Sequence, residues 1–411
     1  MRLALICDFV EENWPSMDLV ADMLLDNLRA EYGSAVKATR VRPGMVWRLS
    51  RLPRFGRTHA AYSVDRLLNR FWDYPRHLAR KGREFDLYHI VDHSYGHLIH
   101  QLPAERTIIT CHDIDTFRCL MEAKREPRSK MFKLMTGRIL SGFRRAAGVS
   151  CVSAATRSEI LKHRLVAPER VVVIPQGVHP ACLPEPDPRS DAEAVRLLGA
   201  ANPDAADILH VGATVARKRI DVLLRVMAAV RQEFPKARLI RVGGPFSRPQ
   251  QELAKRLNLD KSLVVLPFLN RRLLASVYRR ASLLMQPSER EGFGLPVIEA
   301  MACGTPVVAS DVPALQEAGG PSATYCPVAD VPAWSDSVVE LLRERHGKPG
   351  RWNERRLAAL AWAARFSWGE YTRKTVQVYE HVLHEQLARN SANRIEPPVH
   401  CRRWDNGCIP R

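Results

Sequence analysis

The stretch from Pro287 to Ser310, PSEREGFGLPVIEAMACGTPVVAS, decides the fold because it joins a glycine-rich loop to the start of an apolar helix. Glu291 and Glu299 are separated by seven residues, and Gly292-Phe293-Gly294 follows the first of them directly. The helix is expected to begin near Pro296 and to leave its first backbone amides free. Free amides at a helix start attract anions, so this stretch predicts a binding site.

The same stretch suits a ligand that combines hydroxyl groups with phosphate. Its glycines let the backbone approach a ligand where a Cβ would clash. Gly304 is expected to end the helix, and residues 306–309 predict the next buried strand. The alternative is that the two glutamates are solvated charges on a surface helix. We interpret the stretch as a nucleotide-sugar clamp, with Glu291 on the sugar, the loop amides on sugar or phosphate, and Glu299 on the ribose.

These residues resemble the signature of the retaining glycosyltransferases of family 4. That signature is a glutamate, seven residues and a second glutamate, with EGFGxPxxEAMAxGxPVVAS written around them. The resemblance implies an α/β fold of the GT-B type, in which two doubly wound Rossmann-like domains face each other across a cleft. It also implies an architecture that works without a bound metal or a cofactor.

A second group of candidate residues follows a predicted strand at residues 208–211. Gly212 ends that strand, and a basic loop with Arg217 and Lys218 leads into an amphipathic helix. Family 4 enzymes hold the donor diphosphate with an arginine and a lysine in this loop, so the resemblance gives that role to Arg217 and Lys218. Fixed cations stabilise the negative charge that grows on the departing nucleoside diphosphate.

His112 follows another predicted strand, in the sequence ITCHDID at residues 109–115. Ligands of open α/β sheets bind beyond the carboxyl ends of strands. The segment resembles the T-x-H-D strand end of family 4, whose histidine lies near the reacting sugar and the acceptor. Asp113 and Asp115 imitate the D-x-D metal motif of another glycosyltransferase architecture. We reject a metal site, because the resemblance is to the metal-free architecture.

Two loops depart from the family pattern. Relatives carry a pair of glycines in the loop after the first strand, whereas residues 9–15 contain none. No ligand contact is therefore transferred to that loop. After a later strand, Gln176 and His179 replace the asparagine and aspartate of the family's IPNGVD turn. The turn itself is still expected.

Alternating strands and helices predict parallel sheets with right-handed crossovers. We expect an acceptor-binding domain over residues 1–183, completed by a C-terminal helix at about 367–389, and a donor-binding domain over residues 206–366. Residues 184–205 are rich in proline and acids and predict an interdomain linker. Residues 390–411 have little periodicity and predict a flexible tail.

A net charge of +18 over 411 residues favours an anionic partner. The cations concentrate between residues 40 and 83, where Trp47, Phe55 and other apolar residues are interleaved. Such a mixture suits anionic lipid headgroups, nucleic-acid phosphates, or only solvent. The cations of this segment are Arg40, Arg42, Arg48, Arg51, Arg54, Arg57, Arg66, Arg70, Arg76, Arg80, Lys81 and Arg83.

Cysteine usage and hydropathy predict a cytoplasmic protein. The nine cysteines are scattered and odd in number, which indicates reduced thiols rather than a disulfide framework. The first apolar run spans only about six residues before acids follow, too short for a signal peptide or a membrane span. The basic segment adds the option of a peripheral position at the inner face of the plasma membrane.

The resemblance implies transfer of a hexose, with retention, from a UDP- or GDP-sugar to a saccharide or lipid-linked acceptor in cell-envelope or exopolysaccharide glycan synthesis. Two alternatives stay open: an inactive sugar-nucleotide-binding module, and a basic protein that binds nucleic acid or another anionic surface. The complete donor motifs argue against the first, and the lack of a nucleic-acid motif argues against the second. The expected catalytic residues are Glu291, His112, Lys218 and Arg217. The expected donor-binding residues are Gly212, Arg217, Lys218, Glu291, Gly292, Phe293, Gly294 and Glu299.

Overall fold

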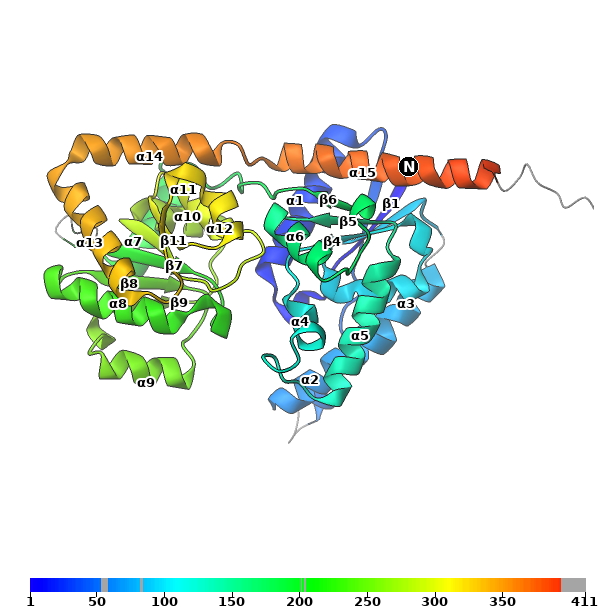
Figure 1. The fold of residues 1–411 in the computed structure, drawn as a ribbon, viewed down its shortest axis with the longest axis horizontal. Helices are drawn as coiled ribbons and strands as arrows, with labels where there is room; N and C mark the ends of the chain where they lie inside the picture. Colours follow the sequence, from blue (N-terminus) through cyan, green and yellow to red (C-terminus); the bar gives the residue numbers. More distant parts are fainter. Residues whose placement is uncertain (53–57, 82–83, 201, 203–204, 393–411) are drawn as a thin grey trace, which may run out of the picture.

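The computed structural model describes residues 1–52, 58–81, 84–200, 202 and 205–392, and these form two parallel sheets of six strands each (Figure 1). The first sheet has the strand order β2-β1-β3-β4-β5-β6. Its strands are β1 (Arg2–Ile6), β2 (Lys37–Val41), β3 (Leu87–Ile90), β4 (Thr107–Cys111), β5 (Gly148–Cys151) and β6 (Val171–Val173). All of its strand pairs are parallel.

The second sheet has the order β12-β11-β10-β7-β8-β9. Its strands are β7 (Asp207–Val211), β8 (Arg238–Val242), β9 (Leu263–Leu266), β10 (Leu283–Gln286), β11 (Val307–Ser310) and β12 (Thr324–Cys326). The strand order reverses between β7 and β10, and ligands of doubly wound sheets bind at such a point. The predicted pair of parallel, doubly wound sheets is confirmed.

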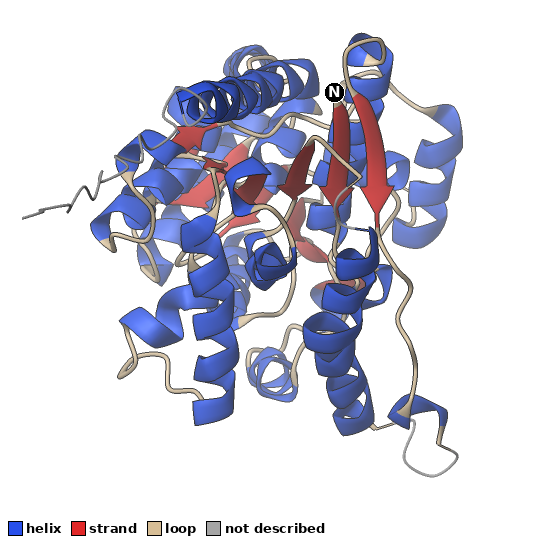
Figure 2. Cartoon of the chain, turned by 90° about the vertical axis from the view of Figure 1, so that its right-hand side faces the viewer, coloured by secondary structure: helices blue, strands red, loops and turns tan. Residues whose placement is uncertain are grey.

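Helices lie on both sides of the strands, as Figure 2 shows from the side. Those of the first half are α1 (Pro15–Tyr32), α2 (His59–Leu68), α3 (Tyr74–Lys81), α4 (Asp115–Met121), α5 (Lys130–Arg145) and α6 (Ala154–Lys162). Those of the second half are α7 (Pro188–Leu198), α8 (Ile220–Glu233), α9 (Arg248–Arg256), α10 (Arg271–Arg280), α11 (Leu295–Ala302), α12 (Pro313–Gly319), α13 (Val331–Gly347), α14 (Pro349–Ala363) and α15 (Trp368–Ala392). Short 3-10 turns connect several of them.

The central strands of each sheet are buried on both faces, because they consist largely of aliphatic residues. In β1, Leu3 and Leu5 pack with α1 on one face, while Ala4 and Ile6 pack in a second cluster on the other. The second sheet divides in the same way: Leu209 of β7 belongs to one cluster and Ile208 to another. Burial on both faces fixes the register of the strands and therefore the positions of the loops at their carboxyl ends.

The stretch predicted as a linker, residues 184–205, contains helix α7 in the structure. Asp187 caps this helix by accepting a hydrogen bond from the amide of Ser190, and α7 packs against α10. At the other end of the chain, α15 crosses back and packs on α1 of the first half (Figure 1). This helix therefore shares a hydrophobic cluster with β1 and α1, although it follows the second sheet in the sequence.

Several predictions fall on residues outside the described ranges. They concern Arg54, Phe55, Arg57, Arg83, Cys401, Cys408 and the tail beyond Ala392. The other seven cysteines are buried free thiols. Among the helices that the structure describes, none is both long enough and apolar enough to cross a lipid bilayer.

Candidate active site

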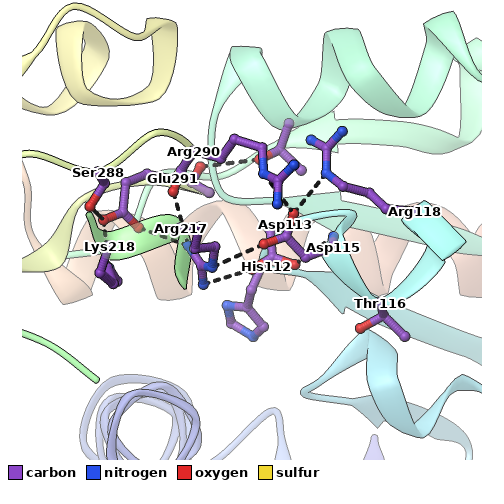
Figure 3. A network of polar contacts seen from close by, with 12 residues as sticks. His112, Asp113, Asp115, Thr116, Arg118, Arg217, Lys218, Ser288, Arg290 and Glu291 are labelled. Carbon is purple, nitrogen blue, oxygen red and sulfur yellow. Dashed lines mark hydrogen bonds and ion pairs between the residues drawn. The ribbon is translucent and has the colours of Figure 1, made fainter. Parts of the chain in front are cut away.

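Glu291 lies in the loop after β10 and is the centre of a polar network (Figure 3). Its Oε1 accepts hydrogen bonds from Lys218 Nζ at 2.5 Å, Ser288 Oγ at 2.7 Å and Gln286 Nε2 at 2.8 Å. Its Oε2 accepts from Arg217 Nη1 at 3.2 Å. The loops after β7 and β10 therefore meet, because these neighbouring parallel strands end at the same edge of the sheet.

The charge of Glu291 is set by its two basic neighbours. Burial opposes ionisation, but Lys218 and Arg217 outweigh it and lower the pKa of Glu291 to about 2. The carboxylate is therefore charged at neutral pH. It can hold the two cations and accept a hydrogen bond from a ligand hydroxyl.

The glycine loop after Glu291 lies directly against the first half of the chain. A Cβ added at Gly292 would stand 1.7 Å from the carbonyl oxygen of His112, which only a glycine avoids. The carbonyl of Gly292 in turn accepts hydrogen bonds from Ser153 Oγ at 2.6 Å and Thr156 Oγ1 at 3.1 Å. Gly294, with a φ of 121°, sits at the N-cap of α11. Phe293 is buried in the same hydrophobic cluster as Leu209 of β7.

His112 uses both ring nitrogens in hydrogen bonds. Nε2 lies 2.8 Å from the carbonyl oxygen of Val91 and must donate to it. Nδ1 then accepts from the Nε2 amide of Gln176, at 3.2 Å. Burial lowers the pKa of His112, so the ring is neutral at pH 7. The structure thus pairs the predicted histidine with the glutamine that departs from the family's asparagine.

Glu299 lies on α11, away from this network. It is buried, and its carboxylate accepts from Arg271 Nη1 at 3.2 Å and from the Tyr278 hydroxyl at 3.1 Å. Burial raises the pKa of Glu299 although Arg271 acts against this. Arg271 also donates to the carbonyl oxygen of Pro15 at 3.0 Å, so Glu299 is linked to the start of α1. Within the described chain, Glu299 and Glu291 share no hydrogen-bond partner.

Arg217 connects the two halves of the chain. Its Nε lies 2.9 Å from Oδ2 of Asp115, and its Nη2 lies 3.5 Å from Oδ2 of Asp113. Both aspartates follow β4 of the first sheet. Burial opposes the charge on Arg217, but Glu291 and these aspartates raise its pKa. The D-x-D sequence therefore binds a guanidinium here.

Sequence reasoning missed the continuation of this network through the first half. Asp115 also accepts from Arg118 Nε at 2.8 Å and lies 3.6 Å from Arg290 Nε. Arg290 reaches Glu126 at 3.2 Å. The only sequence signals were the aspartate pair, interpreted as a false metal motif, and an arginine beside Glu291.

The loop without glycines, residues 9–15, contains a buried acid and follows another one. Glu12 is buried and lies 3.4 Å from Nη1 of Arg70. Asp8, just before this loop, is 2% exposed and has no hydrogen-bond partner for either carboxylate oxygen in the described structure. Burial and the adjacent carboxylate of Asp92 raise the pKa of Asp8.

The first part of the basic segment pairs with acids of its own half. Three of its arginines form ion pairs: Arg40 with Asp22, Arg42 with Asp18 at 2.5 Å, and Arg48 with Asp73 at 2.8 Å. Met45 is buried, and Trp47 packs against Tyr62 with ring centres 6.0 Å apart. The charges of these three arginines are therefore matched by acids within the fold.

Comparison with known proteins relates both halves of the chain to glycosyltransferases. Residues 198–356 match the family model described as glycosyl transferases group 1, and residues 30–181 match the one described as glycosyltransferase family 4. The chain is 32% identical over 238 residues to a D-inositol 3-phosphate glycosyltransferase of Mycobacterium marinum. The matched region is 55% of this chain and 50% of that protein. The chain spans about half the length of the curated relatives it matches.

The fold of this chain resembles solved structures over more than nine-tenths of its length. Sucrose-phosphate synthase from Thermosynechococcus elongatus superposes with a TM-score of 0.69 at 18% identity, covering 94% of this chain and 100% of that one. The Anabaena protein HepE, solved in complex with UDP and glucose, gives a TM-score of 0.69 at 16% identity, with 93% and 100% coverage. At such identities the likeness concerns the fold, and it confirms the predicted GT-B type.

Proposed function

The chain belongs to the family 4 glycosyltransferases, and on this premise we propose that it transfers a hexose from a nucleoside diphosphate sugar, with retention at the anomeric carbon. The observation that carries the proposal is the meeting of Glu291, Lys218 and Arg217 where the strand order of the second sheet reverses. This arrangement offers a carboxylate for sugar hydroxyls beside two cations for a diphosphate. Cleavage of a sugar–phosphate bond needs both.

In the proposed reaction, the bond between the anomeric carbon and the diphosphate oxygen breaks while an acceptor oxygen bonds to the same face. The acceptor hydroxyl gives its proton to the leaving phosphate oxygen, so no protein group has to change its charge. Arg217 and Lys218 stabilise the charge that develops on the diphosphate. Glu291 orients the sugar, and the neutral His112 positions the glycine loop from the opposite half.

The donor is proposed to be a UDP- or GDP-sugar. HepE, which shares the fold, was solved with UDP and glucose, and this supports UDP as the first nucleotide to test. A thermal-shift screen with UDP-glucose, UDP-N-acetylglucosamine and GDP-mannose separates the donors, because a ligand that binds only the native state raises Tm. The donor sugar should give the largest shift.

Release of UDP or GDP in the presence of acceptor mixtures tests the reaction itself. Glu291→Gln should lower turnover about ten-fold or more, since a charged hydrogen bond is lost while volume is kept. Glu340→Gln, an exposed position on α13, is the matched control and should behave like the unaltered protein. Donor binding without any donor-dependent release would contradict the proposal and favour the inactive binding module.

For the acceptor, we propose a saccharide or a lipid-linked molecule of cell-envelope or exopolysaccharide synthesis, met at the cytoplasmic face of an anionic membrane. Residues 59–81 form one continuous helical segment, because a π-helical turn joins α2 to α3. Val64, Leu68 and Trp72 recur on it at four-residue spacing and are 41%, 39% and 56% exposed. An exposed apolar stripe of this kind suits the headgroup boundary of a bilayer.

Cations stand next to this stripe. The guanidinium of Arg76 lies 3.1 Å from the ring centre of Trp72. A cavity of about 510 Å³ beside it is lined in part by Arg76, His77 and Arg80, which suit a lipid phosphate. We therefore propose that the end of this helical segment contacts the lipid surface, rather than the paired arginines before it.

Vesicle sedimentation tests the membrane proposal. Binding should require anionic lipid and weaken with salt, and Trp72→Ser with Arg76→Glu should release the protein. Arg40→Gln removes a cation that is paired with Asp22 and serves as the control. Equal sedimentation with neutral and anionic vesicles, or none with either, would contradict the membrane proposal and leave the donor assignment intact.

A further inference from the structure

Arg241 is a buried cation near the carboxyl end of β8, which lies between β7 and the edge strand β9 of the second sheet. It lies on β8, is 0% exposed, and pairs with no carboxylate among the residues that the structure describes. Its Nη2 donates to the carbonyl oxygen of Gly212 at 2.8 Å, and its Nη1 donates to that of Gly244. Burying an arginine without an acidic partner is costly. Such a charge calls for a compensating group that arrives with a ligand.

The two glycines that Arg241 holds belong to turns at the carboxyl ends of β7 and β8. These turns are stacked: a Cβ at Gly243 would stand 2.1 Å from the carbonyl oxygen of Gly212. Gly212 also begins the loop that carries Arg217 and Lys218, and a Cβ added there would lie 3.6 Å from Lys218 Cε. Arg241 thus bonds directly to the turn from which the donor-binding loop starts.

His210 does not neutralise Arg241. The two residues are register partners on the adjacent strands β7 and β8. His210 is fully buried, and neither ring nitrogen has a hydrogen-bond partner in the described structure. Burial, with Arg241 and Lys218 nearby, lowers the pKa of His210 to about 3. The imidazole is therefore neutral, and the guanidinium has no carboxylate partner in the described structure; it is held by the two carbonyl oxygens and lies over the Phe246 ring, 5.4 Å from the ring centre.

The other two cations of the site differ from Arg241 in this respect. Lys218 is matched by Glu291, and Arg217 is matched by Glu291, Asp113 and Asp115. Arg241 differs because none of these acids, nor any other described carboxylate, is its ion-pair partner. Charge in a water-poor interior acts over longer distances than it does in water.

We propose that Arg241 is a positioning residue for the donor diphosphate, which it favours by fixing both glycine turns and by adding a positive charge that no described carboxylate pairs with. The inference rests on the proposed function, because it concerns the same donor site. Arg241 would then be a fixed internal cation near the diphosphate, on which negative charge develops as the sugar–phosphate bond breaks.

Binding of inorganic pyrophosphate, UDP and GDP to Arg241 variants tests the inference by calorimetry. Arg241→Met should raise the Kd for pyrophosphate and for the preferred nucleotide about ten-fold, as expected when a multiply charged ligand loses one nearby cation. Arg241→Lys keeps the charge but loses the planar fork that bonds both glycine carbonyls, so it should raise the Kd by a smaller factor than Arg241→Met does. Arg238→Met is the control, because Arg238 lies on the same strand and pairs instead with Asp207.

A second variant keeps the guanidinium and cancels its charge. His210→Glu places a carboxylate beside Arg241, so both glycine turns stay bonded while the site loses its surplus charge. It should weaken pyrophosphate binding like Arg241→Met, whereas His210→Gln should not. If Arg241→Met does not fold, His210→Glu tests the proposed role of the Arg241 charge by itself.

The outcomes separate the two proposals. If the unaltered protein binds pyrophosphate, UDP and GDP, but Arg241→Met and His210→Glu bind them equally well, the inference is overturned. An equal loss of uridine or guanosine binding, measured by ligand-observed NMR, would show general disruption and would overturn it too. If the unaltered protein binds none of these ligands, the proposed function itself fails, and the inference fails with it.

Discussion

Arg217 and Asp115 form an ion pair between the two halves of the chain, with Nε and Oδ2 2.9 Å apart (Figure 3). The same guanidinium reaches Asp113 at 3.5 Å and Glu291 at 3.2 Å. A donor diphosphate would have to compete with the two aspartates for this side chain. Donor binding is therefore expected to exchange carboxylates for phosphate on Arg217.

Removing one competing charge should tighten nucleotide binding. Asp113→Asn keeps an oxygen for the amide of Asp115, which it contacts at 2.9 Å, but loses its charge near Arg217. We expect the affinity for the preferred nucleoside diphosphate to rise about two- to five-fold, the size of a partly exposed ion pair. Glu126→Gln removes a carboxylate that pairs with Arg290 and Arg128 but not with Arg217, and it should leave the affinity unchanged. Weaker or unaltered binding in Asp113→Asn would exclude the exchange.

The stability that Glu291 contributes should depend on pH. Its pKa is lowered to about 2, below the ordinary value near 4.5, so its ionised form stabilises the folded state. The contribution is complete above about pH 5 and is lost as the pH falls toward 2. The difference in Tm between the unaltered protein and Glu291→Gln should therefore be constant from pH 5 to 8 and shrink below that range. A difference that persists at the lowest pH at which both proteins fold would refute the ion-pair account.

His112 should affect turnover more than nucleotide binding. Its ring bonds Val91 and Gln176, and its carbonyl oxygen faces the glycine loop, whereas Arg217 and Lys218 are not among its hydrogen-bond partners. His112→Ala should therefore lower turnover by a larger factor than it raises the Kd for nucleoside diphosphate. Gln176→Ala should act in the same direction and more weakly. An equal loss of turnover, binding and folding would make His112 a structural residue.

The fit between the glycine loop and the first half can be tested by one added methyl group. Gly292→Ala would place a Cβ 1.7 Å from the carbonyl oxygen of His112, so the two halves would have to move apart. We expect turnover to fall at least ten-fold, as displacement of reacting groups by about 1 Å can cost more than that. Nucleotide binding should change little. Gly137→Ala on α5, where no atom lies within 4 Å of the new Cβ, is the matched control.

Features that arise within one strand-loop-helix unit could be predicted from the sequence. Gly294 and the apolar residues of α11 follow β10 in the order that the pattern indicated. The contact between Glu291 and Lys218 follows from the sheet order, because their loops leave adjacent strands at one edge. Short-range periodicity therefore predicted most of the fold, whereas the roles expected for Glu291, Arg217 and Lys218 came from the family resemblance.

Contacts between distant segments could not be predicted, because they depend on how the two sheets are placed. The pairing of Arg217 with Asp115 and the contact of Gln176 with His112 belong to this class. The basic segment shows a related difficulty. A run of arginines has the same composition whether a residue such as Arg48 is paired or free, and only the structure shows its partner Asp73.

The crossing of α15 has a consequence for synthesis on the ribosome. Trp368, Tyr371 and Tyr379 of this helix lie in the same core as Leu3 of β1. Roughly 200 residues separate the end of β6 from Trp368, so at about 5–20 residues per second the ribosome needs roughly 10–40 s to supply them. During that interval the nascent first half exposes the apolar surface that α15 later covers. We therefore expect the emerging chain to bind chaperones until its last helix has been translated.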